Sequence, residues 1–326
     1  MSSPFGALAR SLFALSTLVV ASAAFGQSYP SRPITVVVPF PPGASNDALA
    51  RITRDPLSEI LGQPITIENR PGAGGSIGSG TVANAAPDGY TLLIAVNAPI
   101  TMNIYMQKNL PFDPKTAFAP VTLAADTTLL LAVHESVPAK NVSELVAYAK
   151  KNAGKLSYGS AGIGSGHHIT GELLKQKTGI DITHVPYRGS GPAIQDLVAG
   201  HIPISFGTPP AILPQAAAGK IRILAVSEER RYPDLPDVPT IAETVPGVVI
   251  PVTWIGLLVP AGTPRPIVDK LNAAMLATLK KPDVVAKLKQ QGLLAVGQGP
   301  EALEQKIKSE LALWGRVIPS IGIQPE

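Results

Sequence analysis

Residues 34–47, ITVVVPFPPGASND, contain the pattern that decides the fold. The β-branched run at 34–38 is typical of a buried strand, and Pro39 stops it because proline cannot donate to a ladder of hydrogen bonds. The loop that follows ends near Ser45 or Asn46, and either side chain can cap a helix. The stretch therefore predicts a strand, a loop and a helix in that order.

The same order recurs along the chain. Beyond residue 260 the apolar spacing becomes helical, which predicts a helical cap at the C-terminus. Alternating strands and helices with nearly continuous apolar strands favour parallel sheets covered on both faces. We therefore predict an α/β chain with two mainly parallel sheets. Further strands are expected near residues 65–69, 92–95, 129–133, 156–158, 182–185, 202–206, 221–226 and 254–259.

Length and composition restrict the class of protein. With 326 residues, 45% hydrophobic and 15% charged, the chain is long enough for about two domains and apolar enough to fold. Its net charge of +4 is too small to indicate a nucleic-acid partner. It has no cysteine, which excludes disulfides, thiolate metal sites and cysteine nucleophiles.

Residues 1–26 differ in kind from the rest of the chain. Their only charged side chain is Arg10, an apolar run follows it, and small residues end the segment. These are the three parts of a secretory signal peptide, and the run is shorter than the about 20 residues of a membrane-spanning helix. We predict cleavage before Gln27 and a periplasmic location. A retained membrane anchor is the weaker alternative.

Two polar, glycine-rich loops, at residues 43–47 and 159–166, each follow a strand and open a helix. Glycines let successive backbone amides converge, and the helix behind adds free N–H donors and the positive end of its dipole. Ordinary tight turns have the same composition. Two such loops at corresponding places of two sheets, however, suit an acid with two ends.

Motifs for cofactors are weak. The stretch GIGSG at 162–166 has its third glycine one position too early for a dinucleotide fingerprint, and the loops contain no lysine for a triphosphate. The histidines show no metal-ligand spacing. We therefore expect no cofactor and no metal. His167, in the first turn of a helix, and Arg188 could contact an acid, but packing and solvated roles suit them equally.

The stretch GGSIG at 74–78 matches the Gly-x-Ser-x-Gly pattern of hydrolases, so a secreted serine hydrolase using Ser76 is an alternative. Such a nucleophile stands directly on a strand-to-helix turn. Here several turn residues separate Ser76 from the strand at 65–69, which argues against it.

Several separate motifs, taken in order, resemble the periplasmic substrate-binding proteins of tripartite tricarboxylate transporters, the Bug or TctC-like family. The resemblance covers essentially the whole mature chain. The motifs are RPI at 32–34 with PFPPG at 39–43, ENRPGAGG at 68–75, PDGYTLL at 87–93, GS at 159–160 with GSGH at 164–167, VPYRG at 185–189 and PDVPT at 236–240.

The resemblance implies a two-lobed periplasmic-binding-protein fold of type II around a ligand cleft. Residues 27–126 and 252–326 would form the first lobe and 127–251 the second. It implies a non-enzymatic receptor, expected to be a monomer, that delivers a small organic acid to the membrane permease subunits of a tripartite tricarboxylate-type transporter. A ligand-sensing receptor for a two-component system is a further alternative.

The resemblance also implies the ligand contacts. Ala44 departs from the family pattern, which has a second glycine there, and its Cβ restricts the backbone. Dicarboxylates, tricarboxylates, amino acids and aromatic acids all suit such a cleft. The implied contacts are Phe40, Gly43, Ala44, Ser45 and Asp47 in the first loop, Ser160, Ala161, Gly162 and Ser165 in the second, and Asn97 at the end of a strand.

Overall fold

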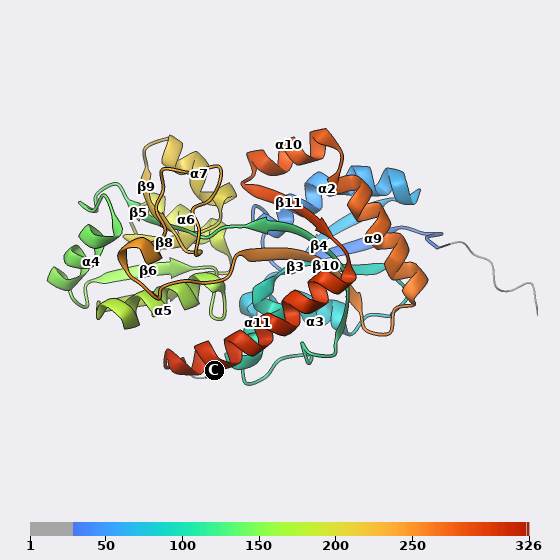
Figure 1. Ribbon diagram of the computed structural model, residues 1–326, viewed down its shortest axis with the longest axis horizontal. Coiled ribbons are helices and arrows are strands. Elements are labelled where there is room, and N and C mark those ends of the chain that lie inside the picture. The colour runs from blue at the N-terminus through green and yellow to red at the C-terminus, as the bar shows by residue number, and fades with distance from the viewer. Residues whose placement is uncertain (1–28, 324, 326) are drawn as a thin grey trace, which may run out of the picture.

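The computed structural model describes residues 29–323 and 325, so the predicted signal peptide lies outside the described residues. Two sheets flanked by helices divide the chain, and we call the halves built on them the first and the second lobe (Figure 1). This confirms the predicted two-lobed α/β class. Among the described residues, no helix combines the length and the apolar character needed to cross a membrane.

The first lobe is built on a six-stranded sheet in the order β11-β4-β10-β3-β1-β2. Its strands are β1 Ile34–Val38, β2 Ile65–Asn69, β3 Thr91–Val96, β4 Phe118–Thr127, β10 Thr253–Pro260 and β11 Leu293–Gln298. One face packs on α2 Ser45–Leu61, α9 Arg265–Leu279 and α10 Pro282–Gln290, and the other on α3 Ser76–Ala83 and α11 Pro300–Ser320. Short turns of helix, η2 Ala73–Gly75, η3 Ala98–Met102 and η4 Asn103–Tyr105, complete it.

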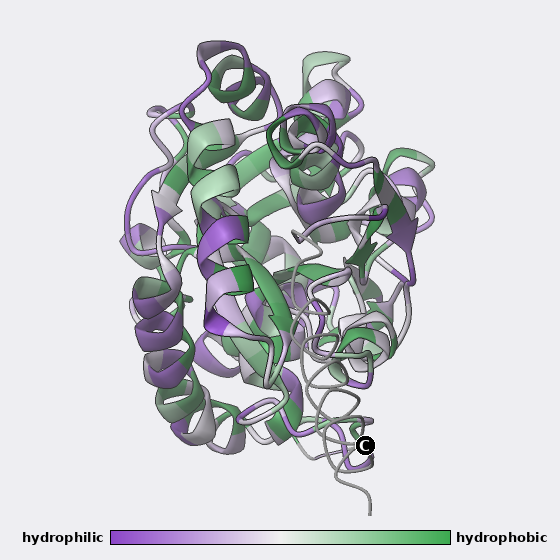
Figure 2. Cartoon of the chain, turned by 90° about the vertical axis from the view of Figure 1, so that its right-hand side faces the viewer, coloured by the Kyte–Doolittle hydropathy of each residue, from purple (hydrophilic) through white to green (hydrophobic). Residues whose placement is uncertain are grey.

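The second lobe is built on a five-stranded sheet in the order β7-β6-β8-β5-β9. Its strands are β5 Leu130–His134, β6 Leu156–Ser160, β7 Ile182–Pro186, β8 Ile204–Gly207 and β9 Ile221–Val226. One face packs on α4 Val142–Lys151, α5 Gly166–Thr178 and α8 Ile241–Thr244, and the other on α6 Ser190–Val198 and α7 Pro209–Ala217. Figure 2 shows hydrophobic strands inside and hydrophilic helix surfaces outside, the pattern that burial of both sheet faces requires.

Both sheets are mixed, which corrects the prediction of mainly parallel sheets. In the first sheet β1 is parallel to β2 and β3, whereas β10 is antiparallel to β3 and β4, and β11 to β4. In the second sheet β6 is parallel to β7 and β8, whereas β5 is antiparallel to β8 and β9. The antiparallel pairs lie where the chain passes from one lobe to the other, out through β4 and β5 and back through β9 and β10. The predicted lobe boundaries at these crossings stay a prediction.

Two strands were missed in the sequence. β4 begins Phe118-Ala119-Pro120 and is rich in alanine, a composition with low strand propensity, but it pairs with β10 on one side and β11 on the other. β11 lies in the region predicted to be helical. In both cases pairing within the sheet outweighs local propensity.

The last helix, α11, packs on both lobes. Leu303 and Ile307 belong to a core cluster of the first lobe, whereas Trp314 and Ile318 are buried in the cluster that holds the second-lobe strands. Figure 1 shows this helix in red, running from one lobe to the other. The helix therefore links the two lobes in addition to the two crossings of the chain.

Candidate ligand-binding site

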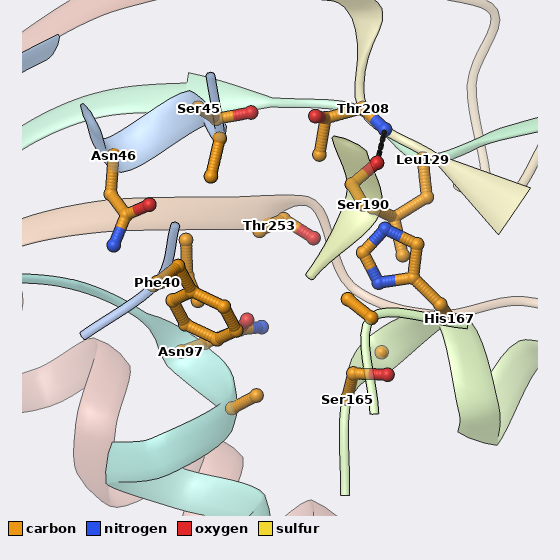
Figure 3. A pocket seen from close by; sticks show the side chains of 15 residues that line it. Phe40, Ser45, Asn46, Asn97, Leu129, Ser165, His167, Ser190, Thr208 and Thr253 are labelled. Carbon is orange, nitrogen blue, oxygen red and sulfur yellow. Dashed lines mark hydrogen bonds between the residues drawn. The ribbon is translucent and has the colours of Figure 1, made fainter. Parts of the chain in front are cut away.

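A small, partly open cavity lies between the lobes. Figure 3 shows polar side chains from several elements pointing into it beside the ring of Phe40. The first lobe contributes Phe40, Ala44, Ser45, Asn46, Val96, Asn97, Ala98 and Thr253, and the crossing and the second lobe contribute Leu129, Ala161, Ser165, Gly166, His167, Ser190 and Thr208.

Four helices begin at this cavity: α2, α5, α6 and α7. Each follows the carboxyl end of a strand, the usual ligand position in open α/β sheets. A helix N-terminus offers free N–H groups and a partial positive charge, which favour an anion. The first turns of α2, α5 and α6 supply such N–H groups, whereas α7 begins with Pro209 and Pro210 and adds only the positive end of its dipole. Within the described residues no Lys, Arg, Asp or Glu lines the cavity. The attraction for an anion therefore comes from the backbone.

The N-terminus of α2 has no side-chain cap in the described part of the chain, which corrects the prediction that Ser45 or Asn46 provides one. Ala44, with extended backbone angles, holds the N-cap position, and Ser45 begins the helix. Asn46 Nδ2 donates instead to Ile94 O at 3.2 Å. The buried Ser45 Oγ has no partner among the described residues. The donors of this first turn are thus available to a ligand.

Asp47 and Gly43 do not line the cavity. Asp47 Oδ2 accepts from Gly43 N and from Arg51 Nε at 2.9 Å each, and Oδ1 accepts from Asn69 Nδ2 at 2.9 Å. Burial alone would raise the pKa of Asp47, but these hydrogen bonds hold it below its usual value. Asp47 therefore stays ionised and fixes the first loop from behind.

The N-terminus of α5 is capped. Ser165 Oγ accepts from His168 N at 3.3 Å and donates to Gly162 O at 2.6 Å. Ser165 and Ala161 line the cavity, whereas Gly162 faces a neighbouring one. The Ser165 hydroxyl thus caps α5 and also holds the second loop in shape.

Ser160 shapes the second loop without lining the cavity. Its hydroxyl lies 2.7 Å from His184 Nε2 and accepts from Gly162 N at 3.1 Å. Burial, followed by the charges of His168 and Lys175, lowers the pKa of His184 to about 3, so this imidazole is neutral at pH 7. The loop therefore keeps its form through neutral hydrogen bonds.

His167 and Thr208 were not among the residues predicted for the site. The His167 side chain is 7% exposed, and among the described residues neither ring nitrogen has a partner. Thr208 Oγ1 is also buried and unpartnered there, although its backbone N donates to Ser190 Oγ at 3.2 Å (Figure 3). Buried polar groups normally have partners, so these atoms indicate a place for a polar ligand. Ser190 and Thr208 carried a signal, since each stands at a helix start after a strand and Ser190 lies between Gly189 and Gly191, but only the loops at 43–47 and 159–166 were interpreted as anion sites.

Asn97 is held in the cavity wall by α11. Its Nδ2 donates to Glu310 Oε2 at 3.3 Å, and the same carboxyl group accepts from Thr101 Oγ1 and Trp254 Nε1 at 3.1 and 3.0 Å. Burial raises the pKa of Glu310. The hydrogen bond to Glu310 therefore fixes the Asn97 side chain in the cavity wall.

The comparisons with known proteins agree with this geometry. Residues 49–323 match the model of the tripartite tricarboxylate transporter family receptor. The chain belongs to this family. The resemblance found in the sequence motifs is thereby confirmed, and the chain is a solute receptor and not an enzyme.

Three solved structures are similar to the receptor over most of its length. The periplasmic binding protein BugD is 34% identical with a TM-score of 0.87, and the comparison covers 91% of the receptor and all of BugD. The R. palustris protein Rpa4515, solved with adipate, is 38% identical with a TM-score of 0.88, covering 92% and 100%. MatC from Rhodopseudomonas palustris, with bound malate, is 36% identical with a TM-score of 0.84, covering 89% and 100%.

The receptor does not use Ser76 as a nucleophile, so the serine hydrolase alternative is wrong. The Ser76 side chain is 1% exposed, and its Oγ accepts from Asn103 Nδ2 at 2.8 Å. Gly74, two residues before it, allows close contact between the lobes, since a Cβ there would lie 2.5 Å from Ile163 O. A hydrolase-like pattern thus arises from a turn that packs on the opposite lobe.

A second, wider cavity of the receptor adjoins the first and shares Phe40 and Ala161 with it. Gly162, Tyr187 and the exposed Arg188 line it. Arg188 therefore lies beside the ligand cavity and not in its wall.

Proposed function

We propose that the receptor binds a small organic acid in the cavity between its lobes and delivers it, in the periplasm, to the membrane permease of a tripartite tricarboxylate-type transporter. The observation that carries this proposal is the meeting of four helix N-termini with three buried side chains, Ser45, His167 and Thr208, whose polar atoms have no partner among the described residues. The adipate and malate in related structures support a carboxylate ligand.

Backbone donors supply the affinity in this proposal. A carboxylate accepts charge-assisted hydrogen bonds from the first turns of helices, and these are stronger where the closed lobes keep water away. Phe40, Ala44, Ser45, Asn97, Ala161 and Ser165 form the predicted wall, while Gly43, Asp47, Ser160 and Gly162 hold the two loops in shape. Specificity then depends on the side chains around the rest of the ligand.

Two further observations support the periplasmic role. The first 26 residues have the composition of a secretory signal peptide. BugD, which the receptor resembles over 91% of the receptor chain, is a periplasmic binding protein. Both favour a receptor that meets its ligand outside the cytoplasm.

Thermal unfolding of the mature receptor, refolded to remove bound ligand, tests the proposal against a panel of mono- and dicarboxylic acids with the corresponding amides as controls. Binding to the folded state at 100 times Kd adds about 2.7 kcal/mol, a shift of several degrees. We expect the acids alone to raise Tm. A panel in which no acid raises Tm would overturn the proposal.

Two variants test whether the acid-induced rise in Tm comes from binding in the cavity. Ala161→Leu places a larger side chain in the cavity wall, whereas Ala147→Leu makes the same change on the exposed surface of α4. We expect the first variant to fold but to lose the acid-induced shift, and the second to keep it. Equal shifts in both would place the acid elsewhere.

A further inference from the structure

His167 is the one titratable side chain that lines the cavity within the described residues. It stands in the first turn of α5, and Figure 3 shows its ring directed into the cavity beside Ser190 and Thr253. Both ring nitrogens are buried and have no partner there. A neutral imidazole in this place offers one donor and one acceptor, and a protonated one offers two donors and a positive charge.

The cavity contains fixed partial positive charges but no full cation among its described lining residues. The helix N-termini suit one carboxylate, with the unpartnered hydroxyls of Ser45 and Thr208 beside them. A second carboxylate in the same enclosed space would lack a counter-charge, and burying an unpaired charge is strongly unfavourable. Among the described residues that line this cavity, only His167 can supply that charge.

We propose that His167 takes up one proton when a dicarboxylate binds, so that its imidazolium neutralises the second carboxylate and the site selects diacids over monoacids. This inference rests on the proposed function and names the ligand class of the same cavity. The proton balance is simple. A dianion and one proton from solvent enter the neutral site, and no other reactant is needed.

The protonation state of the empty site fits this scheme. Burial lowers the pKa of His167 to about 4, so the ring is neutral at pH 7 before the ligand arrives. An opposite charge within about 4–6 Å favours the charged form of a histidine, so a bound carboxylate reverses the effect of burial. Proton uptake and diacid binding therefore support each other.

The other titratable groups that pack behind the cavity wall are already held by partners, whereas Arg188 lies exposed in the adjoining cavity. Their hydrogen bonds and ring contacts leave His167 as the group exposed to the ligand. Asp47 accepts from Gly43, Arg51 and Asn69, and Glu310 accepts from Asn97, Thr101 and Trp254. Glu228 accepts from Thr128 and from Leu129 N, and Glu172 accepts from Tyr158. His168 accepts from Gly164 N and stacks on His184. Burial raises the pKa of Glu228 to about 7, so this carboxyl group is the main competitor for the proton.

The test compares diacids and monoacids of equal length: succinate with butyrate, and adipate with hexanoate. Calorimetry in two buffers of different ionisation enthalpy counts the protons taken up at pH 7, and titrations between pH 6.5 and 8 follow the affinity. We expect one proton and a tenfold rise in Kd per pH unit for a diacid, since the bound form carries one proton more. Monoacids should bind at least tenfold more weakly at pH 6.5 and show neither effect.

Two histidine variants locate the proton. His167→Asn removes the titrating ring but keeps a polar side chain, and His201→Asn changes an exposed histidine that contacts Asp196. We expect His167→Asn to lose the proton uptake and the preference for diacids while still binding monoacids, and His201→Asn to behave as the parent receptor. A purely structural role for His167 would weaken both acids alike and leave the pH slope of diacid binding intact.

The outcomes separate the two proposals. If acids bind but diacids take up no proton, or if uptake persists in His167→Asn because Glu228 receives the proton, this inference is overturned and the proposed function stands. The proton count of the parent receptor decides the first point without any variant. If no acid binds at any pH, both proposals fail.

Discussion

The two helices that begin at the two glycine-rich loops, α2 and α5, meet at one cavity but start in opposite ways. The N-cap of α2 is Ala44, which has no side-chain acceptor, whereas the N-cap of α5 is Ser165, whose hydroxyl accepts from His168 N and donates to Gly162 O. A missing cap costs a helix about 0.5–2 kcal/mol. The difference indicates that the first-turn N–H donors of α2 are available to a ligand, whereas the Ser165 hydroxyl at the start of α5 uses its hydrogen bonds to hold the second loop in shape.

The largest expected effect comes from giving α2 the cap that it lacks. In Ala44→Asp the new carboxylate would accept from the first turn and take the place of a ligand carboxylate. The extended backbone at Ala44 already suits an N-cap residue. We expect the free energy of unfolding to rise by about 1 kcal/mol and the affinity for an acid to fall at least about 100-fold, by occupied donors and repulsion. Calorimetry and urea denaturation measure the two quantities.

Ala44→Ser separates the two causes of that loss. Serine caps the helix without a charge, so we expect a similar gain in stability and a smaller loss of affinity. Unchanged affinity in Ala44→Asp would show that the ligand does not bind at the N-terminus of α2. The missing cap of α2 would then have no role in binding.

A tenfold effect is expected from removing the cap of α5. Ser165→Ala removes the hydroxyl donor to Gly162 O, which then keeps only Ser165 N and Ser160 Oγ as donors, so the second loop becomes less well fixed. We expect the free energy of unfolding to fall by about 1 kcal/mol and the acid affinity to fall about tenfold. The unfolding curve and a titration of the same sample measure both.

Asn141→Ala is the matched control for this cap. Asn141 caps α4 in the same lobe, accepting from Glu144 N at 2.9 Å, but it does not line the cavity. We expect the same loss of stability with no change in acid affinity. If both variants weakened binding equally, the effect would come from general stability and not from the loop.

The contrast between the two loops also shows how far the sequence could be interpreted. Both loops and their helices were predicted, since a β-branched run, a proline stop and glycines are local signals. The mixed pairing was not predicted, because β4 lacks strand propensity and is stabilised only by β10 and β11. Local patterns predict elements, but sheet order depends on contacts between distant segments.

The cavity could be predicted only in part for a similar reason. Phe40, Ala44, Ser45 and Asn97 follow strand ends, and the family motifs indicated them. Ser190, between Gly189 and Gly191, and Thr208, after Gly207, also stand at helix starts, but their short loops were not interpreted as part of a site. Asp47 was predicted to contact the ligand, and only its three hydrogen bonds show that it fixes the loop instead. A residue type at a helix start suggests a site, whereas its partners decide whether it faces the ligand or the loop.

The smallest expected effect concerns α7, whose N-cap Thr208 also leaves its first turn without a side-chain cap in the described structure. Its buried Oγ1 has no partner in the part of the chain that the structure describes, so Thr208→Val replaces a desolvated hydroxyl by a methyl group of similar size. We expect the empty receptor to become up to about 1 kcal/mol more stable and the acid affinity to fall a few-fold, because a ligand partner is lost. Denaturation of the ligand-free protein and one titration measure both.

Thr170→Val makes the same change where the hydroxyl is already used. Thr170 Oγ1 donates to Gly166 O at 2.7 Å, so this variant should lose about 1 kcal/mol of stability instead of gaining it. Opposite changes in the free energy of unfolding for the two threonine variants would show that the Thr208 hydroxyl, unlike that of Thr170, forms no hydrogen bond in the empty receptor and is available to a ligand. Equal losses of stability would mean that the Thr208 hydroxyl already has a hydrogen-bond partner in the empty receptor. The uncapped helix N-termini would then be solvated by water, and their lack of a cap would not indicate a ligand site.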